Sequence, residues 1–423
     1  MTAGRGERPR RKSARRPRGV SSPSDVARKV VRDERDVVLG GRVVAASARR
    51  VVVADGLAMV RVTLREDLPG PLEPGDLACF EGRLRRGRLE KARLVERTAG
   101  RPPSTSSEFG RLTLDGVGWR LAARSTALRT VREYFDAEGF LEVETPVRVA
   151  SPGLDAHVDA VRAEGGFLIT SPELHMKRLL VGGLPRLYQL ARVSRAGEEG
   201  ALHEPEFTIL EWYRAFSGIE EMIRDTEQLV EAVVSRLSPA KKKRLTVTAP
   251  DGRAVDVTPP FRRITVRDAF LAHAAVADAA ALAASDRDRY YRTFVDAVEP
   301  ALAREESAVV LWEFPITEAA LARPCPHDGA VAERFEVYVG GVELCNGFGE
   351  LTDAAEQRRR FEAELERRRR AGAPEQPIDE AFLAALAEGM PPSGGNALGF
   401  DRLVMLALGA ACIADVTAFP RGR

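Results

Sequence analysis

The stretch RFEVYVGGVELCNGFGE, residues 334–350, predicts two β-strands joined by a tight turn at its central Gly-Gly pair. Glycine at both turn positions favours a two-residue hairpin, whose backbone needs positive φ angles. In that hairpin Tyr338 lies opposite Glu343, and Glu336 shares the face of Tyr338 because side chains alternate along a strand. Glu336 and Glu343 are then diagonal neighbours, roughly 7 Å apart. The stretch therefore predicts an antiparallel sheet that presents two carboxylates on one face.

Two carboxylates at that distance repel each other unless a cation lies between them, and Mg²⁺ with bound phosphates is the usual cation. A second stretch, GGNALGFDRLVMLALG (residues 394–409), places Arg402 in the first turn of an apolar helix after a Gly-rich approach. A cation is unfavourable at the positive end of a helix dipole unless an anion also binds there. Acids for a metal and an arginine for a phosphate together indicate an ATP site.

Length and composition limit the number of domains and the classes of protein that are possible. The 423 residues are enough for two or three domains, and the net charge of +2 conceals a basic N-terminus, since residues 1–20 hold eight Arg or Lys and one Glu. We expect residues 1–35 to be a basic, disordered tail that could contact nucleic acid or a ribosome. The sequence has no signal-peptide pattern and no apolar run of membrane-spanning length. Its four scattered cysteines, without a CxxC pair, are typical of a reduced cytoplasmic protein without structural zinc.

The chain divides by pattern into two folded parts. Residues 36–99 contain short Val-rich runs broken by Gly and Pro, which predicts a small OB-like β-barrel. Residues 100–423 begin with a linker and a predicted helix at about 120–138, and then mix strands and helices. An Ala-rich helical insertion is expected around 266–304. This second part predicts an α+β domain.

The middle of this α+β domain supplies further polar side chains. Residues 185–195 and 205–214 predict two paired strands, and Phe207, Glu211 and Tyr213 share one face of the second. An aromatic ring, a carboxylate and a phenol in line are spaced to stack a base and then hold a small polar group.

Two further charged residues lie at the ends of elements. Arg195 ends the first of these strands, where it could neutralise an α-phosphate during in-line attack. Upstream, Glu173 lies in the first turn of a helix that starts at Ser171-Pro172.

Three segments resemble the motifs of class II aminoacyl-tRNA synthetases, in the branch that holds the lysyl-tRNA synthetases. GFLEVETP (139–146) is similar to motif 1, residues 195–214 to motif 2, and GNALGFDR (395–402) to motif 3. The resemblance covers about residues 107–423 and is closer still to the elongation factor P lysine ligases, synthetase paralogues that modify a protein. The sequence segments shared with these ligases include SPELHMKRLLVGG, HEPEFTILEWYR and AERFEVYVGGVELCNGF. Three separated motifs in the right order are a specific signal.

The resemblance implies a class II core, an antiparallel sheet flanked by helices, that binds ATP and Mg²⁺. It implies roles for seven residues. For the adenine, Phe207 stacks on the ring, Glu198 contacts the amino group, and Arg402 covers the ring and also contacts the γ-phosphate. For the phosphates, Arg195 contacts the α-phosphate, His203 lies nearby, and Glu336 and Glu343 bind Mg²⁺. Motif 2 departs from the family pattern, because Gly197 puts Glu198 one place late and Ala201 stands where an arginine is common. We expect either that the flexible Gly197 lets Glu198 reach the adenine amino group, or that this contact is lost.

The resemblance also implies an amino-acid pocket. Glu173 corresponds to the ligand of the α-amino group, and the side-chain pocket corresponds to Glu211, Tyr213, Asn346, Phe348 and Glu350. Because Glu343 is out of step with the last three, the strand must bulge near residues 345–347. Three carboxylates around a small substrate favour a substrate with two ammonium groups, lysine or β-lysine, since uncompensated buried acids are costly.

Two features favour the ligases over the tRNA synthetases. Ala397 stands where lysyl-tRNA synthetases generally have Gly, and its methyl group narrows one side of the pocket. Phe80 is the only aromatic residue of 36–98, whereas anticodon-binding OB domains stack bases on aromatic rings. We therefore expect an ATP-dependent ligase that transfers lysine or (R)-β-lysine to a lysine ε-amine of elongation factor P, acting as a cytoplasmic homodimer through motif 1.

Other functions remain open at this stage. A lysyl-tRNA synthetase is the alternative enzyme, with tRNA as the acceptor. A non-catalytic paralogue that binds nucleic acid or a ribosome would use the barrel and the basic tail, and a free-standing ligase would use a small-molecule acceptor.

Overall fold

The computed structural model describes residues 19–31, 33–68, 70–104, 107–154, 158–238, 244–319 and 321–421. They form two compact units, Met1–Ala122 and Ala123–Arg423. This division lies later in the chain than the expected boundary between residues 99 and 100. The long helix α2 (Val117–Ala137), predicted at about 120–138, spans it.

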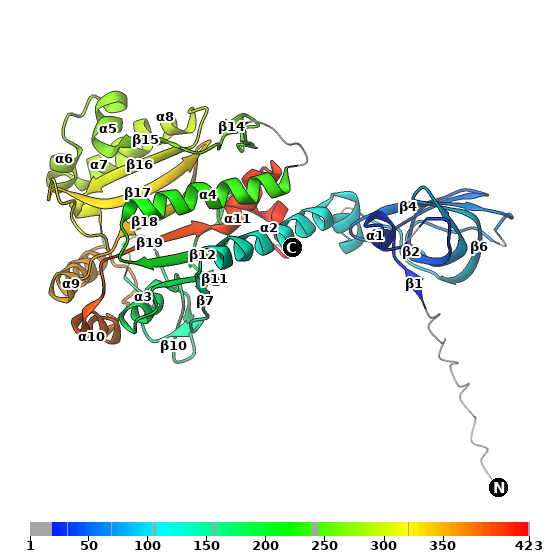
Figure 1. The fold of residues 1–423 in the computed structure, drawn as a ribbon, viewed down its shortest axis with the longest axis horizontal. Helices are drawn as coiled ribbons and strands as arrows, with labels where there is room; N and C mark the ends of the chain where they lie inside the picture. Colours follow the sequence, from blue (N-terminus) through cyan, green and yellow to red (C-terminus); the bar gives the residue numbers. More distant parts are fainter. Residues whose placement is uncertain are drawn as a thin grey trace, which may run out of the picture. The chain divides into compact units, whose positions relative to one another are not determined.

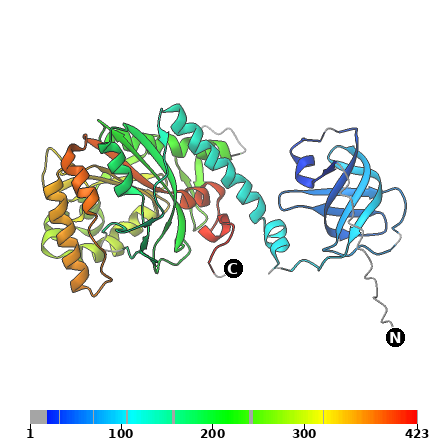
Figure 2. The same cartoon turned by 90° about the horizontal axis from the view of Figure 1, so that it is seen from below.

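The first unit is a closed five-stranded barrel of the OB type, as predicted (Figure 2). Strands β2-β3-β4-β6-β5 pair in this order, and a β2–β5 pairing closes them into the barrel. The short strand β1 pairs with β2 in addition, in parallel. The elements are β1 (Val20–Ser21), α1 (Pro23–Ala27), β2 (Asp36–Ala46), β3 (Arg50–Ala54), β4 (Met59–Leu64), β5 (Leu77–Arg85) and β6 (Arg88–Thr98). Phe80, the only aromatic residue of 36–98, is fully buried in the barrel core, so its ring cannot stack on a base.

The expected tail differs in part from the structure. Residues 1–18 lie outside the described residues. Residues 20–27, predicted to be disordered, form β1 and α1 instead. Val20 pairs with Val38 of β2, and Val26 is buried in the barrel core. The composition of the flanking residues concealed this short amphipathic piece, because two apolar side chains suffice to attach it to the barrel.

The second unit is built on an eight-stranded sheet with the order β15-β16-β17-β18-β19-β12-β11-β7 (Figure 1). Only the outer pairs β15–β16 and β7–β11 are parallel. The strands are β7 (Leu141–Glu142), β11 (Arg186–Ser194), β12 (Glu206–Ala215), β15 (Arg262–Thr265), β16 (Val309–Pro315), β17 (Val331–Val339), β18 (Val342–Gly349) and β19 (Ser393–Gly399). The predicted antiparallel sheet with flanking helices is therefore present.

Helices and short strands surround this sheet. The helices are α3 (Glu173–Val181), α4 (Ile219–Leu237), α5 (Val266–Ala274), α6 (Ala279–Ser285), α7 (Arg287–Thr293), α8 (Glu299–Ala303), α9 (Ala354–Arg370), α10 (Glu380–Gly389) and α11 (Phe400–Leu408). The remaining strands are β8 (Arg148–Val149), β9 (Arg162–Ala163), β10 (Gly166–Leu168), β13 (Thr246–Thr248) and β14 (Ala254–Asp256). Helices α5–α8 are the predicted Ala-rich insertion. Among the described residues no single helix is long and apolar enough to cross a membrane; α5 and α6 meet that measure only as a pair bent by 89°.

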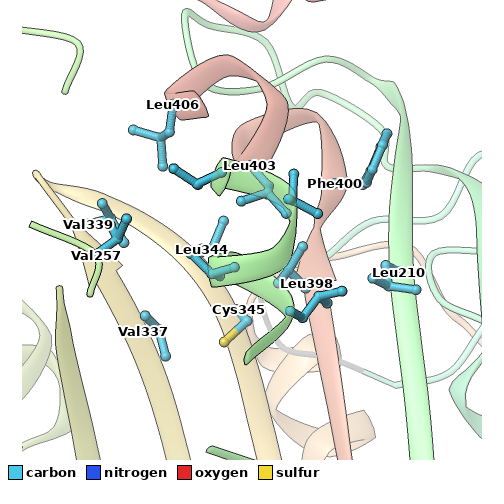
Figure 3. Close-up of a cluster of buried hydrophobic side chains, with 14 of the residues drawn as sticks. Leu210, Val257, Val337, Val339, Leu344, Cys345, Leu398, Phe400, Leu403 and Leu406 are labelled. Atoms are coloured by element: carbon cyan, nitrogen blue, oxygen red, sulfur yellow. The ribbon is translucent and has the colours of Figure 1, made fainter. Parts of the chain in front are cut away.

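One face of the sheet is apolar and carries the main core. Leu210 of β12, Val337 of β17 and Leu398 of β19 are fully buried there. Figure 3 shows these side chains packed against Leu403 and Leu406 of α11. Burying such side chains is the main favourable term in folding, so this layer fixes which face of each central strand is left for polar groups.

Substitutions in the hairpin turn between β17 and β18 test how much the predicted turn geometry contributes to stability. Gly340 and Gly341 have φ angles of 57° and 83°. A methyl group on Gly340 would also lie 2.5 Å from the Cβ of Ala249. We expect Gly340→Ala to lower the free energy of unfolding by about 2–4 kcal/mol, from backbone strain and overpacking combined.

Gly165→Ala is the matched control for this substitution. Gly165 has a φ angle of 76°, and no atom lies within 4 Å of the added methyl group. This variant should lower the free energy of unfolding by only the cost of the backbone strain, about 1 kcal/mol. Urea unfolding measures both variants, and equal losses would show that the contact with Ala249 does not limit the turn.

Candidate active site

The second face of the sheet carries a polar row that crosses four neighbouring strands. Glu336 of β17 is paired with Asn346 of β18, and Asn346 with Ala397 of β19. Ala397 is paired in turn with Glu211 of β12. Directly paired residues present their side chains on the same face, so strands distant in sequence place two acids, an amide and a methyl group in one line.

A β-bulge brings Glu343 onto this face. Val337 pairs with Cys345 while the next residue, Tyr338, pairs with Glu343, which leaves Leu344 as an extra residue in β18. Leu344 and Cys345 both enter the apolar core. The predicted bulge therefore exists, but it lies at Leu344, just before the expected residues 345–347. The predicted pairing of Tyr338 with Glu343 is confirmed.

The polar face opens into a cavity of about 500 Å³, a volume typical of small-molecule sites. Twelve of the predicted site residues line it: Glu173, Arg195, Glu198, His203, Phe207, Glu211, Glu336, Glu343, Asn346, Phe348, Ala397 and Arg402. Tyr213 and Glu350 do not line it, because both are buried beneath the surface of the cavity. The structure therefore brings together residues that are more than 200 positions apart in sequence.

One end of the cavity is positively charged. Arg402 lies in the first turn of α11, as predicted, and donates to the backbone oxygens of Glu343 at 2.7 Å and Leu202 at 3.2 Å. Its Nη2 lies 2.8 Å from Nε2 of His203. Burial and the Arg402 charge lower the pKa of His203, so this imidazole is neutral at pH 7 and can accept from the guanidinium.

The irregular motif 2 loop also faces the cavity. Gly197 has a φ angle of 78°, and Glu198 lines the cavity with its Oε1 3.6 Å from Nη1 of Arg195. The guanidinium of Arg195 lies 5.1 Å from the ring centroid of Phe207. The inserted glycine therefore leaves an acid at this end, next to the arginine and the aromatic ring.

The two acids of the hairpin differ in their partners. Glu336 is buried, accepts from Arg334 at 2.5 Å, and accepts from the hydroxyl of Tyr338 at 2.6 Å. Glu343 keeps 42% of its side chain exposed in the cavity, and its ion-pair partner among the described residues is the distant Arg402, at 3.9 Å. Partial loss of hydration within the cavity and the neighbouring Glu336 raise the pKa of Glu343 above its usual value. A cation in the cavity would relieve this repulsion, which fits the Mg²⁺ expected here.

The other end of the cavity is built to hold positive charge. Glu211 is fully buried, with Ser171 Oγ donating to it at 2.6 Å and Tyr213 Oη at 3.1 Å. Burial and the nearby Glu173 raise the pKa of Glu211 to about 8. The side-chain oxygen of Asn346 is buried and has no hydrogen-bond partner among the residues that the structure describes. An unpaired acceptor beside an acid that resists ionisation fits a ligand with an ammonium group.

A lysine that the sequence analysis did not identify lies between two of the predicted acids. Nζ of Lys177 lies 2.6 Å from Glu173 and 2.5 Å from Glu350. Burial opposes its charge, but the two carboxylates outweigh burial and raise the pKa of Lys177 to about 12. Burial raises the pKa of Glu350, the Lys177 ammonium opposes this rise, and the nearby Glu173 adds to it.

This lysine changes the charge count of the pocket. Three carboxylates, Glu173, Glu211 and Glu350, face one lysine, so the fully ionised pocket has a net charge of −2. Two ammonium groups of a diamino acid would neutralise it. Sequence spacing could have indicated the lysine, since Lys177 follows Glu173 by one helical turn. Arg334 was also missed, although it shares a strand face with Glu336 two residues away.

The fold and the site together define a class of protein, the class II aminoacyl-tRNA synthetases. The family model of the class II tRNA synthetases (D, K and N) matches residues 107–423, so this chain belongs to that family. The barrel lies outside the matched residues.

Several curated proteins that are similar to this chain share one name. The elongation factor P--(R)-beta-lysine ligase of Edwardsiella ictaluri is 42% identical over 313 residues, which cover 71% of this chain and 94% of that protein. The ligase of the same name from Erwinia tasmaniensis is 42% identical over 317 residues, with the same coverage. That of Yersinia enterocolitica is 40% identical over 317 residues, 72% of this chain and 95% of that protein. The predicted resemblance to this ligase family is confirmed.

The raised pKa of Glu211 predicts a pH-dependent stability of the unliganded protein. Its pKa is about 8 when folded and about 4.5 when unfolded, so the folded state holds the proton more tightly. Stability from this group is therefore lost as pH rises from about 4.5 to about 8. We expect Glu211→Gln to reduce that loss by on the order of 3 kcal/mol, measured by urea unfolding at pH 5.5 and 8.5.

Glu206→Gln serves as the control, because Glu206 is an exposed acid on the same strand. This variant should keep the pH dependence of the parent protein. An unchanged pH dependence in Glu211→Gln would contradict the role given to burial of Glu211.

Proposed function

We propose that this protein is an ATP-dependent ligase that activates lysine or (R)-β-lysine and transfers it to a lysine ε-amine of elongation factor P. The observation that carries the proposal is the pocket at Glu211, where three carboxylates face one lysine, so that the two ammonium groups of a diamino acid would balance the fully ionised acids. The similarity to ligases of that name, at about 40% identity over nearly their whole length, supports the acceptor.

The first step is adenylate formation. A carboxylate oxygen of the amino acid attacks the α-phosphorus of ATP, the bond to the β-phosphate oxygen breaks, and pyrophosphate leaves. Arg195 neutralises the charge that develops on the α-phosphate, and Arg402 and His203 bind the outgoing phosphates. Mg²⁺ held by Glu336 and Glu343 would neutralise phosphate charge. Phe207 stacks on adenine, and Glu198 accepts from the adenine amino group.

The second step transfers the acyl group. The acceptor's neutral ε-amine attacks the acyl carbon, an amide bond forms, a proton leaves the amine, and AMP departs. No protein nucleophile takes part, so positioning supplies the catalysis. Glu173 holds the α-amino group, and Glu211, with Tyr213 behind it, holds the second amine. Asn346, Phe348 and Glu350 complete the pocket.

Amino-acid-dependent ATP–pyrophosphate exchange tests the first step, and transfer of labelled amino acid tests the second. We expect exchange with (R)-β-lysine or L-lysine, and label that moves to elongation factor P and not to tRNA. Transfer to tRNA would favour the lysyl-tRNA synthetase, a function that the burial of Phe80 disfavours. No exchange with any diamino acid would overturn the proposal.

Ala397 tests which amino acid is preferred. Its methyl group lies on the polar row between Glu211 and Asn346, where it restricts the position of the second amine. Ala397→Gly should shift the kcat/KM ratio toward L-lysine by about tenfold, the effect of one methyl group in a pocket. A parallel loss for both amino acids would mean that the methyl group only supports packing.

We also propose that the enzyme is a cytoplasmic homodimer that associates through the motif 1 segment, residues 139–146. Leu141, in an edge strand of the sheet, is 51% exposed, and the nearby Val147 is 55% exposed. Light scattering should give twice the 46.2 kDa of one chain, and Leu141→Asp should give the single-chain mass. A single-chain mass for the unchanged protein would refute the dimer.

A further inference from the structure

Three side chains of different chemistry meet at β16, and none of them lines the cavity described above. Glu313 lies in β16, and Cys325 and His327 lie in the segment that connects it to β17. Their ligand atoms all lie within 4.8 Å of one another. Among the described residues, no other group of three His, Cys, Asp or Glu side chains meets this distance criterion.

The distances suit a tetrahedral metal ion. Nε2 of His327 lies 3.3 Å from Oε1 of Glu313. With usual Zn–N and Zn–O bonds of about 2.0–2.1 Å, the edge between two ligands of a tetrahedral site is also about 3.3 Å. The corresponding edge from a zinc-bound sulfur is about 3.5 Å. The thiol of Cys325, at most 4.8 Å away, therefore has to approach by about 1.3 Å at most.

The backbone holds these ligands in place. Glu313 has a φ angle of 59° and lies at a register shift, where it faces two residues of β17. The amide of Cys325 donates to Val331 at 2.9 Å, which attaches the connecting segment to the start of β17. A non-glycine residue in the left-handed region is uncommon, and such residues concentrate at binding sites.

An ion pair between Glu313 and His327 would explain why these two side chains lie close together, but it does not explain the position of Cys325. Cys325 is 7% exposed and takes no part in that pair, yet its sulfur lies within 4.8 Å of the ligand atoms of both Glu313 and His327. The side chain of His327 is 61% exposed and that of Glu313 is 17% exposed, so the site is open to solvent on one side. A buried sulfur, an imidazole and a carboxylate around an open position form the ligand set of a zinc site with three protein ligands.

We propose that Glu313, Cys325 and His327 bind one Zn²⁺ ion, with water in the fourth position. Thiolate and imidazole ligands select Zn²⁺ over Mg²⁺, which prefers oxygen. On binding, the thiol releases its proton to solvent and the imidazole binds in its neutral form. The absence of a CxxC pair had indicated no structural zinc, because the carboxylate ligand lies 12 positions before the cysteine and only the fold brings it near.

The site is linked to the cavity through the next residue of β16. The ring of Phe314 lies 4.5 Å from the guanidinium of Arg334, which pairs with Glu336. An ion bound to Glu313 would fix the register shift that positions Phe314. The metal site itself does not depend on the proposed ligase function.

Cobalt absorption of the full-length, reduced protein tests the proposal. Co²⁺ bound to a thiolate gives a near-ultraviolet sulfur-to-cobalt charge-transfer band, which carboxylates such as Glu336 and Glu343 cannot produce. We expect this band to saturate at one Co²⁺ per chain, to disappear on addition of Zn²⁺, and to persist in excess Mg²⁺.

Variants assign the ligands. Cys325→Ser should abolish the band, and His327→Gln should weaken Co²⁺ binding at least tenfold. Cys412→Ser, at a half-buried cysteine outside the cluster, should leave both unchanged. Circular dichroism and thermal unfolding without metal should show that each variant is folded. The absence of the band from the parent protein, its persistence in Cys325→Ser, or an unchanged Co²⁺ affinity in His327→Gln would overturn the proposal.

Discussion

The site depends on the two-sided alternation of an antiparallel sheet, interrupted once. Strands β12, β19, β18 and β17 bury one face against α4 and α11, so their alternate side chains form a continuous polar surface. In a regular strand, without the bulge at Leu344, Glu343 and Asn346 are three positions apart and would point to opposite faces. The bulge therefore allows one strand to present both the acid Glu343 and the amide Asn346 to the cavity.

Electrostatics then divides the cavity into two ends. Arg195, Arg402 and the neutral His203 form an end suited to phosphates, whereas Glu173, Glu211 and Glu350 with Lys177 form an end suited to ammonium groups. Both ends are unfavourable when empty, because buried charges lack water. Substrate binding would relieve this cost, so the stability of the unliganded protein is lower than its core alone would give.

The departures from the family pattern have local explanations in the structure. Gly197 adopts a positive φ angle, and Glu198 lines the cavity beside Arg195 although it comes one position late. Where an arginine is common, the backbone oxygen of Ala201 accepts from the amide of Ile413. The neighbouring oxygen of Leu202 accepts from Arg402. The loop is thus attached to the motif 3 helix through its backbone, which does not require that side chain.

The sequence by itself determined the α+β class, the barrel, the hairpin and most residues of the cavity. These follow from short-range rules: alternation along strands, glycine at turns, helix spacing, and motifs of fixed order. Sequence alone did not determine the attachment of residues 20–27 to the barrel, because two apolar side chains give no periodic signal.

Only the tertiary structure decided the pairing of distant residues. It placed Lys177 between Glu173 and Glu350, moved Tyr213 and Glu350 beneath the cavity surface, and brought Glu313 to Cys325 and His327. Such contacts depend on strand order and on the exact position of a bulge, which arise from the packing of the whole sheet. Local spacing in the chain indicated a bulge near residues 345–347, but it gave neither the strand order nor the exact position of the bulge.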